Sequence, residues 1–563
     1  MDILNAICQQ TAEPGQPFEL TEITVRGQQL RAWKNAPATL RDLWLSTEAH
    51  AANDYIVYGD ERLSYAEAHA IVIRIAGWLK DNGIEQGDRV AIAMRNYPEW
   101  ILAYWAITAM GCVAVGMNAW WVAEEMDYAL EDSGARVLIA DAERLARFNE
   151  IRDRFEHIKV VSVRCDEPPA WTTAWDQIQP AGSLLPHVDI DPDDDACVFY
   201  TSGTTGRPKG AQLTHRGCTQ NAFSMVFLSF TQSLAIAKRH NDPTMDPTSG
   251  LAPSPAALLA TPLFHVTANN CGAQPTTLMG GKLVLMYKWD AGEALRLIEQ
   301  ERIRTLSTVP AMARDMVMHP DFGKRDLSTV QSLGGGGAAV QPDLVKRIDA
   351  RGYRPSQGYG MTETCGIISA SIGDFLAEKP ESCGMIVPIY DARVVDEAGV
   401  PQPAGAVGEL CVRGPQVIKG YLNRPEATAD TIDGGWLRTG DIARIDEDNF
   451  LYLIDRAKDM VLRGGENVYC SEVENALFHF DGVREAAVFS VPDERLGEEV
   501  GAAIYCENGT VDVNELRAHC RQHIAAFKVP RYIWLTDQPL PRNANGKFLK
   551  RELRETLAIE DAI

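Results

Sequence analysis

The sequence predicts an α/β protein: a large N-terminal domain of βαβ subdomains plus a small antiparallel β subdomain, followed by a small α+β C-terminal domain. Up to about residue 390, apolar strand-like segments alternate with helical ones, which is the pattern of parallel βαβ units. From 392 to 454, short strands follow one another with no long helix between them. A last αβ set begins at about Arg456, so we expect domains at 1–454 and 455–563.

The first elements carry clear local signals. Residues 55–58 and 62–64 flank a Gly-Asp turn and predict a hairpin. Ser64 and Glu67 have the spacing of a capping box, which predicts a helix from there to about 82. The alternation then predicts strands at 89–94, 112–116 and 136–140 and helices at 97–110 and 124–132.

The rest of the chain gives the same alternation and then the antiparallel set. We expect strands at 282–286, 305–309 and 330–333, with helices that begin after Asp290 and near 342. The antiparallel subdomain is expected to hold strands at 392–395, 409–413, 442–445 and 450–454. In the C-terminal domain we expect a helix capped by Ser471 and Glu474, strands at 485–491 and 500–505, and a helix at 513–525.

Composition excludes several classes of protein. The 563 residues include 45% hydrophobic and 23% charged residues, as in ordinary globular domains. The net charge of −23 argues against a dedicated nucleic-acid binder and against a polybasic membrane anchor. The 12 cysteines form no CxxC pair, and the N-terminal segment lacks the pattern of a signal peptide. We therefore expect a cytoplasmic protein.

One uncharged run, Trp100–Ala123, is long enough to span a bilayer. The alternative is a buried helix at 101–110 that ends at Gly111 and leads into an interior strand. We favour the buried helix, because the asparagine and glycines within the run fit a helix–turn–strand unit. No transmembrane segment is therefore expected.

The strongest motif is Tyr200-Thr-Ser-Gly-Thr-Thr-Gly-Arg-Pro-Lys-Gly210, which follows an apolar strand at 197–200. Its glycines let successive backbone N–H groups converge on an anion, and its hydroxyls and Lys209 add donors and charge. The spacing is not that of a Walker A loop. A flexible Ser/Gly linker is the alternative, and the apolar strand that leads directly into the motif argues against it.

Weaker motifs follow. Gly334–Gly337 and Gln357–Thr364 are glycine-containing segments that we expect as loops after strands, where open α/β sheets bind ligands. Trp436–Asp441 predicts a carboxylate on a turn, suited to ribose hydroxyls or simply exposed to solvent. Asp455–Asp459 and the lysine in Pro541–Lys547 are, taken alone, most simply solvent-exposed.

In this order, the motifs resemble those of the adenylate-forming superfamily of acyl-CoA synthetases, stand-alone peptide-synthetase adenylation domains and firefly luciferase. The resemblance covers about residues 40–550 and rests on YTSGTTGRPKG, GYGMTET, WLRTGD, DRAKDM and NGK. It implies that a carboxylate attacks the α-phosphate of ATP and that a thiol, usually that of CoA, then displaces AMP. ATP, Mg²⁺ and CoA are the implied cofactors and co-substrates.

The resemblance also implies roles for particular residues. The phosphate loop would be Thr201, Ser202, Gly203, Thr204, Thr205, Gly206 and Lys209. Glu363 matches the Mg²⁺ ligand and Thr362 the hydroxyl near the α-phosphate. Adenine would lie against Tyr359 and Gln357, with Gly336 and Gly358 beside it, and the ribose at Asp441 and Arg456.

Three further residues match parts of the family's catalytic cycle. Lys547 matches the lysine that bridges the carboxylate and the α-phosphate during adenylation. Asp459 matches the hinge about which a mobile C-terminal domain rotates between the half-reactions. His265 matches an aromatic gate near the carboxylate, although a hydrogen-bonded core histidine remains the alternative.

The acid itself is not identified by these motifs, because the segments that flank the acyl pocket depart from the family pattern. GYGMTE favours a bulky hydrophobic acid, either a medium- or long-chain fatty acid or an aryl acid. The alternatives are an enzyme that loads a carrier protein in trans and a non-catalytic nucleotide-binding relative. The partners expected are thus small molecules with no nucleic acid, and self-association is left open.

Residues 517–551 carry eight cations against one acid, and we expect part of this segment to meet CoA phosphates.

Overall fold

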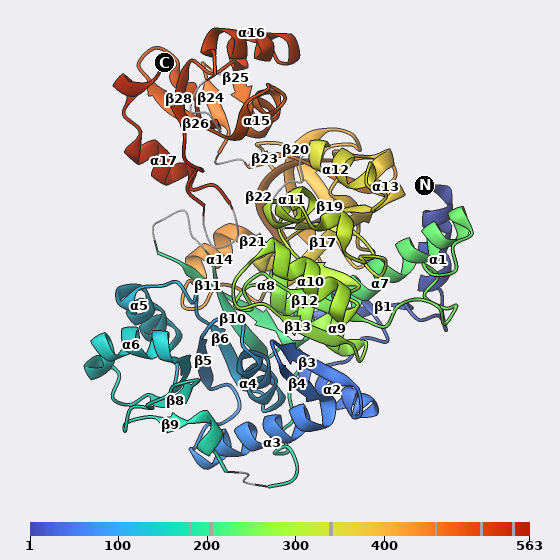
Figure 1. The fold of residues 1–563 in the computed structure, drawn as a ribbon, viewed down its shortest axis with the longest axis vertical. Helices are drawn as coiled ribbons and strands as arrows, with labels where there is room; N and C mark the ends of the chain where they lie inside the picture. The colour runs from blue at the N-terminus through green and yellow to red at the C-terminus, as the bar shows by residue number, and fades with distance from the viewer. Residues whose placement is uncertain are drawn as a thin grey trace. The chain divides into compact units, whose positions relative to one another are not determined.

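The computed structural model describes residues 1–179, 182–201, 207–336, 342–456, 459–464, 466–506, 511–542 and 547–563 (Figure 1). These residues form two compact units. Unit 1 comprises Met1–Pro380, Gly384–Asp391 and Arg413–Leu437. Unit 2 comprises Glu381–Cys383, Ala392–Val412 and Arg438–Ile563. The expected boundary between 454 and 455 stays a prediction.

The first large sheet of unit 1 has the strand order β11-β10-β6-β5-β7-β8-β9. Neighbouring strands from β10 to β9 are parallel, whereas β11 is antiparallel to β10. The bounds are β5 Arg89–Ala93, β6 Val113–Gly116, β7 Val137–Asp141, β8 Lys159–Val163, β9 Thr173–Ala174, β10 Asp195–Thr201 and β11 Lys209–Thr214. The predicted parallel core is therefore present, with a hairpin at one edge.

The alternation of side chains along β5 divides the helices between the two faces of this sheet. Val90 and Ile92 share a core with α3 (Tyr65–Asp81) and α4 (Pro98–Ala109). The intervening residues of β5 pack on the other face, against α5 (Ala123–Ser133) and α6 (Ala142–Ile151). Ser64 caps α3 in the predicted capping box.

A second sheet, β14-β12-β13-β3-β4, packs against the same α3–α4 layer. Its strands are β3 Asp54–Tyr58, β4 Glu61–Ser64, β12 Ala256–Leu259, β13 Lys282–Leu285 and β14 Thr305–Ser307. Because α4 lies in the core between two sheets, it needs no polar face, which explains the long uncharged run. In the part of the chain that the structure describes, no helix is long and apolar enough to cross a membrane.

The other face of this second sheet carries its own helices, α10 (Ala291–Glu301), α11 (Pro310–Met318) and α12 (Pro342–Asp349). A further run of strands in unit 1 has the order β15-β16-β17-β18. Its bounds are β15 Leu333–Gly336, β16 Pro355–Met361, β17 Gly366–Ile372 and β18 Gly384–Ile386. The strand predicted at 330–333 is thus displaced, and it continues into the glycines that were expected to form a loop.

The remaining elements of unit 1 are mainly N-terminal or connect the sheets. They are α1 Asp2–Ala12, β1 Leu20–Val25, β2 Gln28–Trp33, α2 Leu40–Ser46, α7 His215–His240, α8 Val266–Ala268, α9 Gln274–Leu278, α13 Asp374–Glu378, α14 Pro425–Thr431 and β21 Ile432–Asp433. Thr214 caps the long helix α7.

Unit 2 contains two groups of strands. The order β23-β22-β20-β19 forms the predicted antiparallel subdomain, with bounds β19 Asp391–Val395, β20 Val407–Arg413, β22 Trp436–Ile445 and β23 Phe450–Arg456. The C-terminal sheet has the order β25-β24-β27-β26, and β28 pairs with β27. Its elements are β24 Val461–Arg463, β25 Glu466–Val468, α15 Cys470–Phe478, β26 Val483–Asp493, β27 Gly497–Cys506, α16 Val513–His523, β28 Tyr532–Thr536 and α17 Lys550–Thr556. The predicted α/β fold class is confirmed.

One predicted helix cap in unit 2 is wrong. Helix α15 begins at Cys470, so Ser471 lies inside it and donates its hydroxyl to the carbonyl of Ile454. Glu474 does not close a capping box either. Its carboxylate accepts from the Val488 N–H at 2.8 Å and pairs with Lys550 at 2.7 Å. Tertiary partners outweigh the local capping signal here.

Candidate active site

The predicted phosphate loop connects the two strands of the β10–β11 hairpin. Thr201 and Lys209 face each other at the base of this hairpin, and the Thr201 hydroxyl donates to the Lys209 carbonyl at 3.4 Å. Ser202, Gly203, Thr204, Thr205 and Gly206 lie outside the described residues. Their assignment to the nucleotide phosphates stays a prediction. After the motif the chain turns back along β10 as β11, and α7 begins at His215.

Lys209 and Glu363 lie on either side of Tyr421, a residue that the sequence analysis missed. The Lys209 Nζ lies 5.0 Å from the centroid of the Tyr421 ring. The Tyr421 hydroxyl donates to Glu363 Oε1 at 2.8 Å, and both side chains are buried. Burial, and then the neighbouring carboxylate, raise the pKa of Tyr421, so its hydroxyl stays a donor. Lys209 and Glu363, which were both expected to lie at the phosphates of ATP, therefore belong to one cluster around Tyr421.

The predicted adenine residues lie on a strand and not on a loop. Gln357 and Tyr359 are two residues apart on β16, so their side chains share one face of the strand, and both are buried. Gly336 on β15 is in register with Gly358 on β16. A Cβ on Gly336 would lie 3.3 Å from the Gly358 carbonyl oxygen, so small residues keep these strands close. The strand fixes the spacing of the two side chains more firmly than a loop would.

Thr362 and Glu363 follow directly in a 3₁₀ turn, Thr362–Thr364, at the end of β16. This turn brings the Mg²⁺-type carboxylate next to the adenine strand in the sequence and in space. Among the described residues, no three or more His, Cys, Asp or Glu side chains are grouped so as to hold a metal. Mg²⁺ in nucleotide sites needs no such group, because it takes one or two carboxylates and completes its coordination with phosphates and water. The single buried carboxylate of Glu363 fits that requirement.

His265 lies at the carboxyl end of β12, half-buried, in the turn that leads into α8. Its ring is 4.7 Å from that of Phe264, and Phe264 meets Trp120 edge-on at 5.5 Å. Trp120 is 43% exposed, although it is a large aromatic side chain. The candidate gate therefore lies beside an aromatic surface, and the assignment of His265 as a gate stays a prediction.

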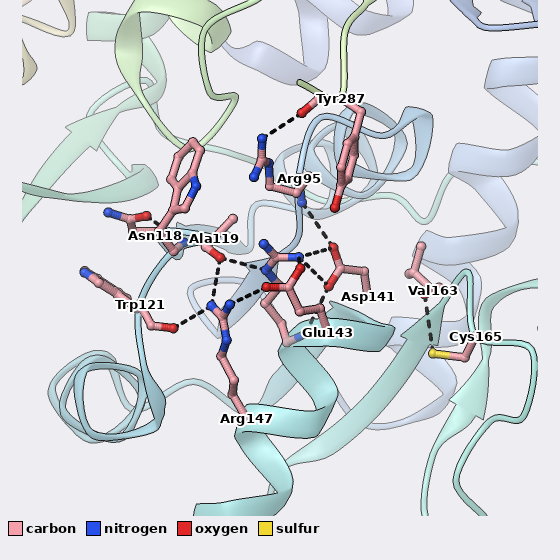
Figure 2. A network of polar contacts seen from close by, with 12 residues as sticks. Arg95, Asn118, Ala119, Trp121, Asp141, Glu143, Arg147, Val163, Cys165 and Tyr287 are labelled. Atoms are coloured by element: carbon pink, nitrogen blue, oxygen red, sulfur yellow. Dashed lines mark hydrogen bonds and ion pairs between the residues drawn. The ribbon is translucent and has the colours of Figure 1, made fainter. Parts of the chain in front are cut away.

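A buried ion pair and a neighbouring arginine bind the backbone of the segment that carries Trp120 (Figure 2). Arg144 is 1% exposed, pairs with Asp141 at 3.1 Å and donates from Nε to the Ala119 carbonyl at 2.8 Å. Arg147 adds donations to the carbonyls of Ala119 at 2.9 Å and Trp121 at 2.7 Å. The loop after β6 is thus fixed at its backbone, which leaves the indole of Trp120 to face outward.

The guanidinium of Arg95 stacks on the ring of Trp120 and on that of a second aromatic residue, Tyr287. Its guanidinium lies 4.5 Å from the ring centroid of Trp120 and 4.8 Å from that of Tyr287, and it donates to the Tyr287 carbonyl at 2.8 Å. The backbone N–H of Arg95 binds Asp141 at 3.3 Å. The carboxyl ends of β5, β6, β12 and β13 therefore meet here, as expected for a ligand site in α/β sheets.

In unit 2, Asp441 and Arg456 face each other across the β22–β23 pair. Arg456 Nε lies 3.4 Å from Asp441 Oδ1, and the carboxylate is largely buried while the guanidinium is 42% exposed. Asp441 was expected on a turn, but it lies within β22. Strand pairing therefore brings together the two residues predicted to bind ribose, and that role stays a prediction.

The hinge and lysine candidates are also in unit 2. The carbonyl of Asp459 accepts from the Cys470 thiol at 2.8 Å, at the start of α15. Lys547 lies just before α17 and is half-buried. Neither the hinge role of Asp459 nor the catalytic role of Lys547 follows from these contacts alone, so both stay predictions.

The cationic segment 517–551 is largely compensated by acids from elsewhere in unit 2. The pairs are Lys528–Glu472 at 2.7 Å, Arg531–Asp493 at 3.1 Å, Arg542–Glu485 at 2.9 Å, Lys550–Glu474 at 2.7 Å and Arg551–Glu555 at 2.8 Å. Counting charges along the sequence overlooked these partners, because most of them lie far away in the chain. Five of the eight cations are therefore paired within the unit, and the contact of part of this segment with CoA phosphates stays a prediction.

Two family models match this chain, one for AMP-binding enzymes over residues 44–422 and one for their C-terminal domain over residues 472–547. The chain belongs to the adenylate-forming superfamily of AMP-binding enzymes. It is 37% identical over 502 residues to a feruloyl-CoA synthase of Amycolatopsis sp., covering 88% of this chain and 94% of that protein. It is 33% identical over 503 residues to a long-chain-fatty-acid–CoA ligase of Mycobacterium tuberculosis, and the match covers 88% of this chain and 93% of that protein.

A solved structure gives the same result. The o-succinylbenzoate CoA synthetase of Bacillus subtilis, in complex with its acyl-adenylate intermediate, matches with a TM-score of 0.76 and 27% identity. The match covers 91% of this chain and 97% of that one. The predicted superfamily and the predicted enzyme class, an AMP-forming acyl-CoA ligase, are confirmed.

Proposed function

We propose that this enzyme converts a bulky hydrophobic carboxylic acid, fatty or aryl, into its CoA thioester by way of an acyl-adenylate. The observation that carries the proposal is the Lys209–Tyr421–Glu363 cluster, which combines an ammonium and a buried carboxylate beside the adenine strand. The preference for a hydrophobic acid is supported by the aromatic surface at Trp120 and Phe264. The named relatives act on acids of this kind.

In the first half-reaction, a carboxylate oxygen of the acid attacks the α-phosphorus of ATP, and the bond to pyrophosphate breaks. Lys209 and Thr362 would offset the negative charge on the phosphates, and Lys547 would offset the charge on the carboxylate and α-phosphate. Glu363 would hold Mg²⁺, which supplies charge neutralisation at the phosphate oxygens when bound. Gln357 and Tyr359 would orient the adenine.

In the second half-reaction, the CoA thiolate attacks the acyl carbon, and AMP leaves with the oxygen that came from the acid. Asp441 and Arg456 would hold the ribose, and Asp459 would be the hinge of the C-terminal domain. The 12 cysteines are free thiols, which is consistent with a reducing cytoplasm as the site of the reaction.

The test is a panel of fatty and aryl acids, assayed for pyrophosphate release with and without CoA. We expect release that depends on the acid, with a preference for hydrophobic acids, and faster turnover with CoA. Release that CoA does not accelerate would favour loading of a carrier protein instead. No release with any acid in the panel would contradict the proposal.

A further inference from the structure

The segment that carries Tyr421 connects the phosphate loop to the Mg²⁺-type carboxylate. We call residues 418–422 the clip. Its backbone pairs with β11: Lys419 N–H donates to the Gln212 carbonyl at 3.0 Å, Gln212 N–H to Gly420 at 2.9 Å, and Leu422 N–H to Gly210 at 2.8 Å. Because β11 begins at Lys209, the clip is fixed to the strand that leaves the phosphate loop.

The same clip binds the Thr362–Thr364 turn at two points. The Ile418 N–H donates to the Glu363 carbonyl at 3.0 Å, which fixes the backbone of that residue. The Tyr421 hydroxyl donates to Glu363 Oε1 at 2.8 Å, which fixes the carboxylate. A donor on one oxygen of a carboxylate sets the direction of the other oxygen.

The ring of Tyr421 also faces a charge. Lys209 Nζ lies 5.0 Å from the ring centroid, within the range of a cation–π contact. The Tyr421 N–H donates to the Thr428 hydroxyl at 2.9 Å, so the clip is anchored behind the ring as well. One side chain therefore touches both groups that would meet the phosphates of bound ATP.

We propose that Tyr421 is a positioning residue that aligns the Glu363 carboxylate for Mg²⁺ when Lys209 engages the nucleotide. The proposal rests on the proposed function, because it assigns Glu363 to the metal of MgATP. A hydroxyl that only filled space would affect ATP binding equally with and without Mg²⁺. A hydroxyl that orients the metal ligand affects only the gain in ATP affinity that Mg²⁺ supplies.

The experiment compares wild type with Tyr421→Phe by isothermal titration calorimetry of ATP, without acid, in excess Mg²⁺ and in EDTA. We expect the ATP affinity in EDTA to stay within about twofold. We expect the gain from Mg²⁺ to fall about tenfold, the size of one hydrogen bond to a charged group. In a Glu363→Gln background, Tyr421→Phe is expected to change the gain no further, because the amide that still accepts from Tyr421 lacks the charge that binds Mg²⁺.

Tyr390→Phe is the matched control. The hydroxyl of Tyr390 is also buried and donates to the Thr364 carbonyl at 3.3 Å, so it supports the same turn without touching the carboxylate. We expect this variant to keep the full increase in ATP affinity that Mg²⁺ supplies. Thermal unfolding of all variants checks that they fold.

Two results would overturn the inference: an unchanged gain from Mg²⁺ in Tyr421→Phe, or equal losses of ATP affinity with and without Mg²⁺. Neither result bears on the proposed function, which fails separately if wild type binds MgATP but releases no pyrophosphate with any acid.

Discussion

The hydroxyl of Tyr421 donates to Glu363 Oε1 over 2.8 Å, in a segment 58 residues further along the chain. This contact joins a buried carboxylate to the strand that leaves the phosphate loop. A charged group that is buried and hydrogen-bonded in this way has one defined orientation, which is what a metal ligand requires. The site thus has a second layer of residues, outside the motifs on which the resemblance rests.

Replacing Glu363 by Gln is expected to remove the carboxylate charge while keeping an acceptor for Tyr421. We expect acid-dependent pyrophosphate release to fall by about 10²–10³, since a charged group at the transferring phosphate is lost. Steady-state assays over a range of Mg²⁺ concentrations measure the effect. Glu426→Gln, on an exposed residue of α14, is the control and is expected to keep normal activity.

Lys547→Ala is expected to separate the two half-reactions. Adenylation should fall by about 10²–10³, because a cation opposite the carboxylate and α-phosphate is removed. Transfer to CoA from a chemically prepared acyl-adenylate should stay within a few-fold of wild type. Arg551→Ala removes a nearby cation that pairs on the surface with Glu555, and it should leave both rates unchanged. Normal adenylation in Lys547→Ala would show that the lysine is misassigned.

Much of the architecture could be predicted from the sequence, because its signals are local. The capping box of Ser64 and Glu67 starts α3 as expected, and the apolar run at 101–110 is a core helix. Glycines misled the prediction on β16, where Gly358 and Gly360 were taken as signs of a loop. In a strand with close neighbours, glycine instead leaves room for the adjacent backbone, as at Gly360, where a Cβ would lie 1.8 Å from the Gly366 oxygen.

The parts of the site that could not be predicted depend on partners far away in the sequence. Tyr421 carries no local signal, since its role arises from contacts with Lys209 and Glu363. The cations of 517–551 likewise gain their acids only on folding. Sequence reasoning found single residues that match motifs, but it could not find the contacts that orient them.

Arg144→Met is expected to destabilise the protein by about 3–5 kcal/mol, because it leaves the buried Asp141 carboxylate without its ion-pair partner. Urea unfolding followed by tryptophan fluorescence measures the loss. Arg147→Met is the control. The wild-type Arg147 side chain binds the same loop, but it is 24% exposed, and its carboxylate partner, Glu143, is on the surface. This control should lose about 1 kcal/mol or less. Equal losses in the two variants would show that the buried pair has no special role.

The stability of unit 2 should depend on the pH through Asp455. Burial raises the pKa of this carboxyl from 3.8 to about 6, so the folded state holds its proton more tightly than the unfolded chain. As the pH rises from about 4 to 6, the unfolded chain releases this proton while the folded state still holds it, so the free energy of unfolding falls, by about 3 kcal/mol in all. The fall levels off above pH 6, once the folded state has released the proton as well.

Asp455→Asn removes this dependence. The difference in free energy of unfolding, variant minus wild type, should be about 3 kcal/mol larger at pH 8 than at pH 4, so the variant gains stability relative to wild type as the pH rises. Asp561→Asn, at an exposed position, is the control and should show no such difference. Denaturant unfolding at both pH values provides the comparison, and a constant offset between wild type and Asp455→Asn would refute the assignment.

The central claim is that the enzyme activates its acid as an acyl-adenylate. The most direct measurement is to supply the acid with both carboxylate oxygens labelled with ¹⁸O, together with ATP and CoA, and to weigh the products by mass spectrometry. An acyl-adenylate route transfers one labelled oxygen to the phosphate of AMP and leaves the pyrophosphate unlabelled. AMP without the label, or label in ADP or inorganic phosphate, would contradict the account.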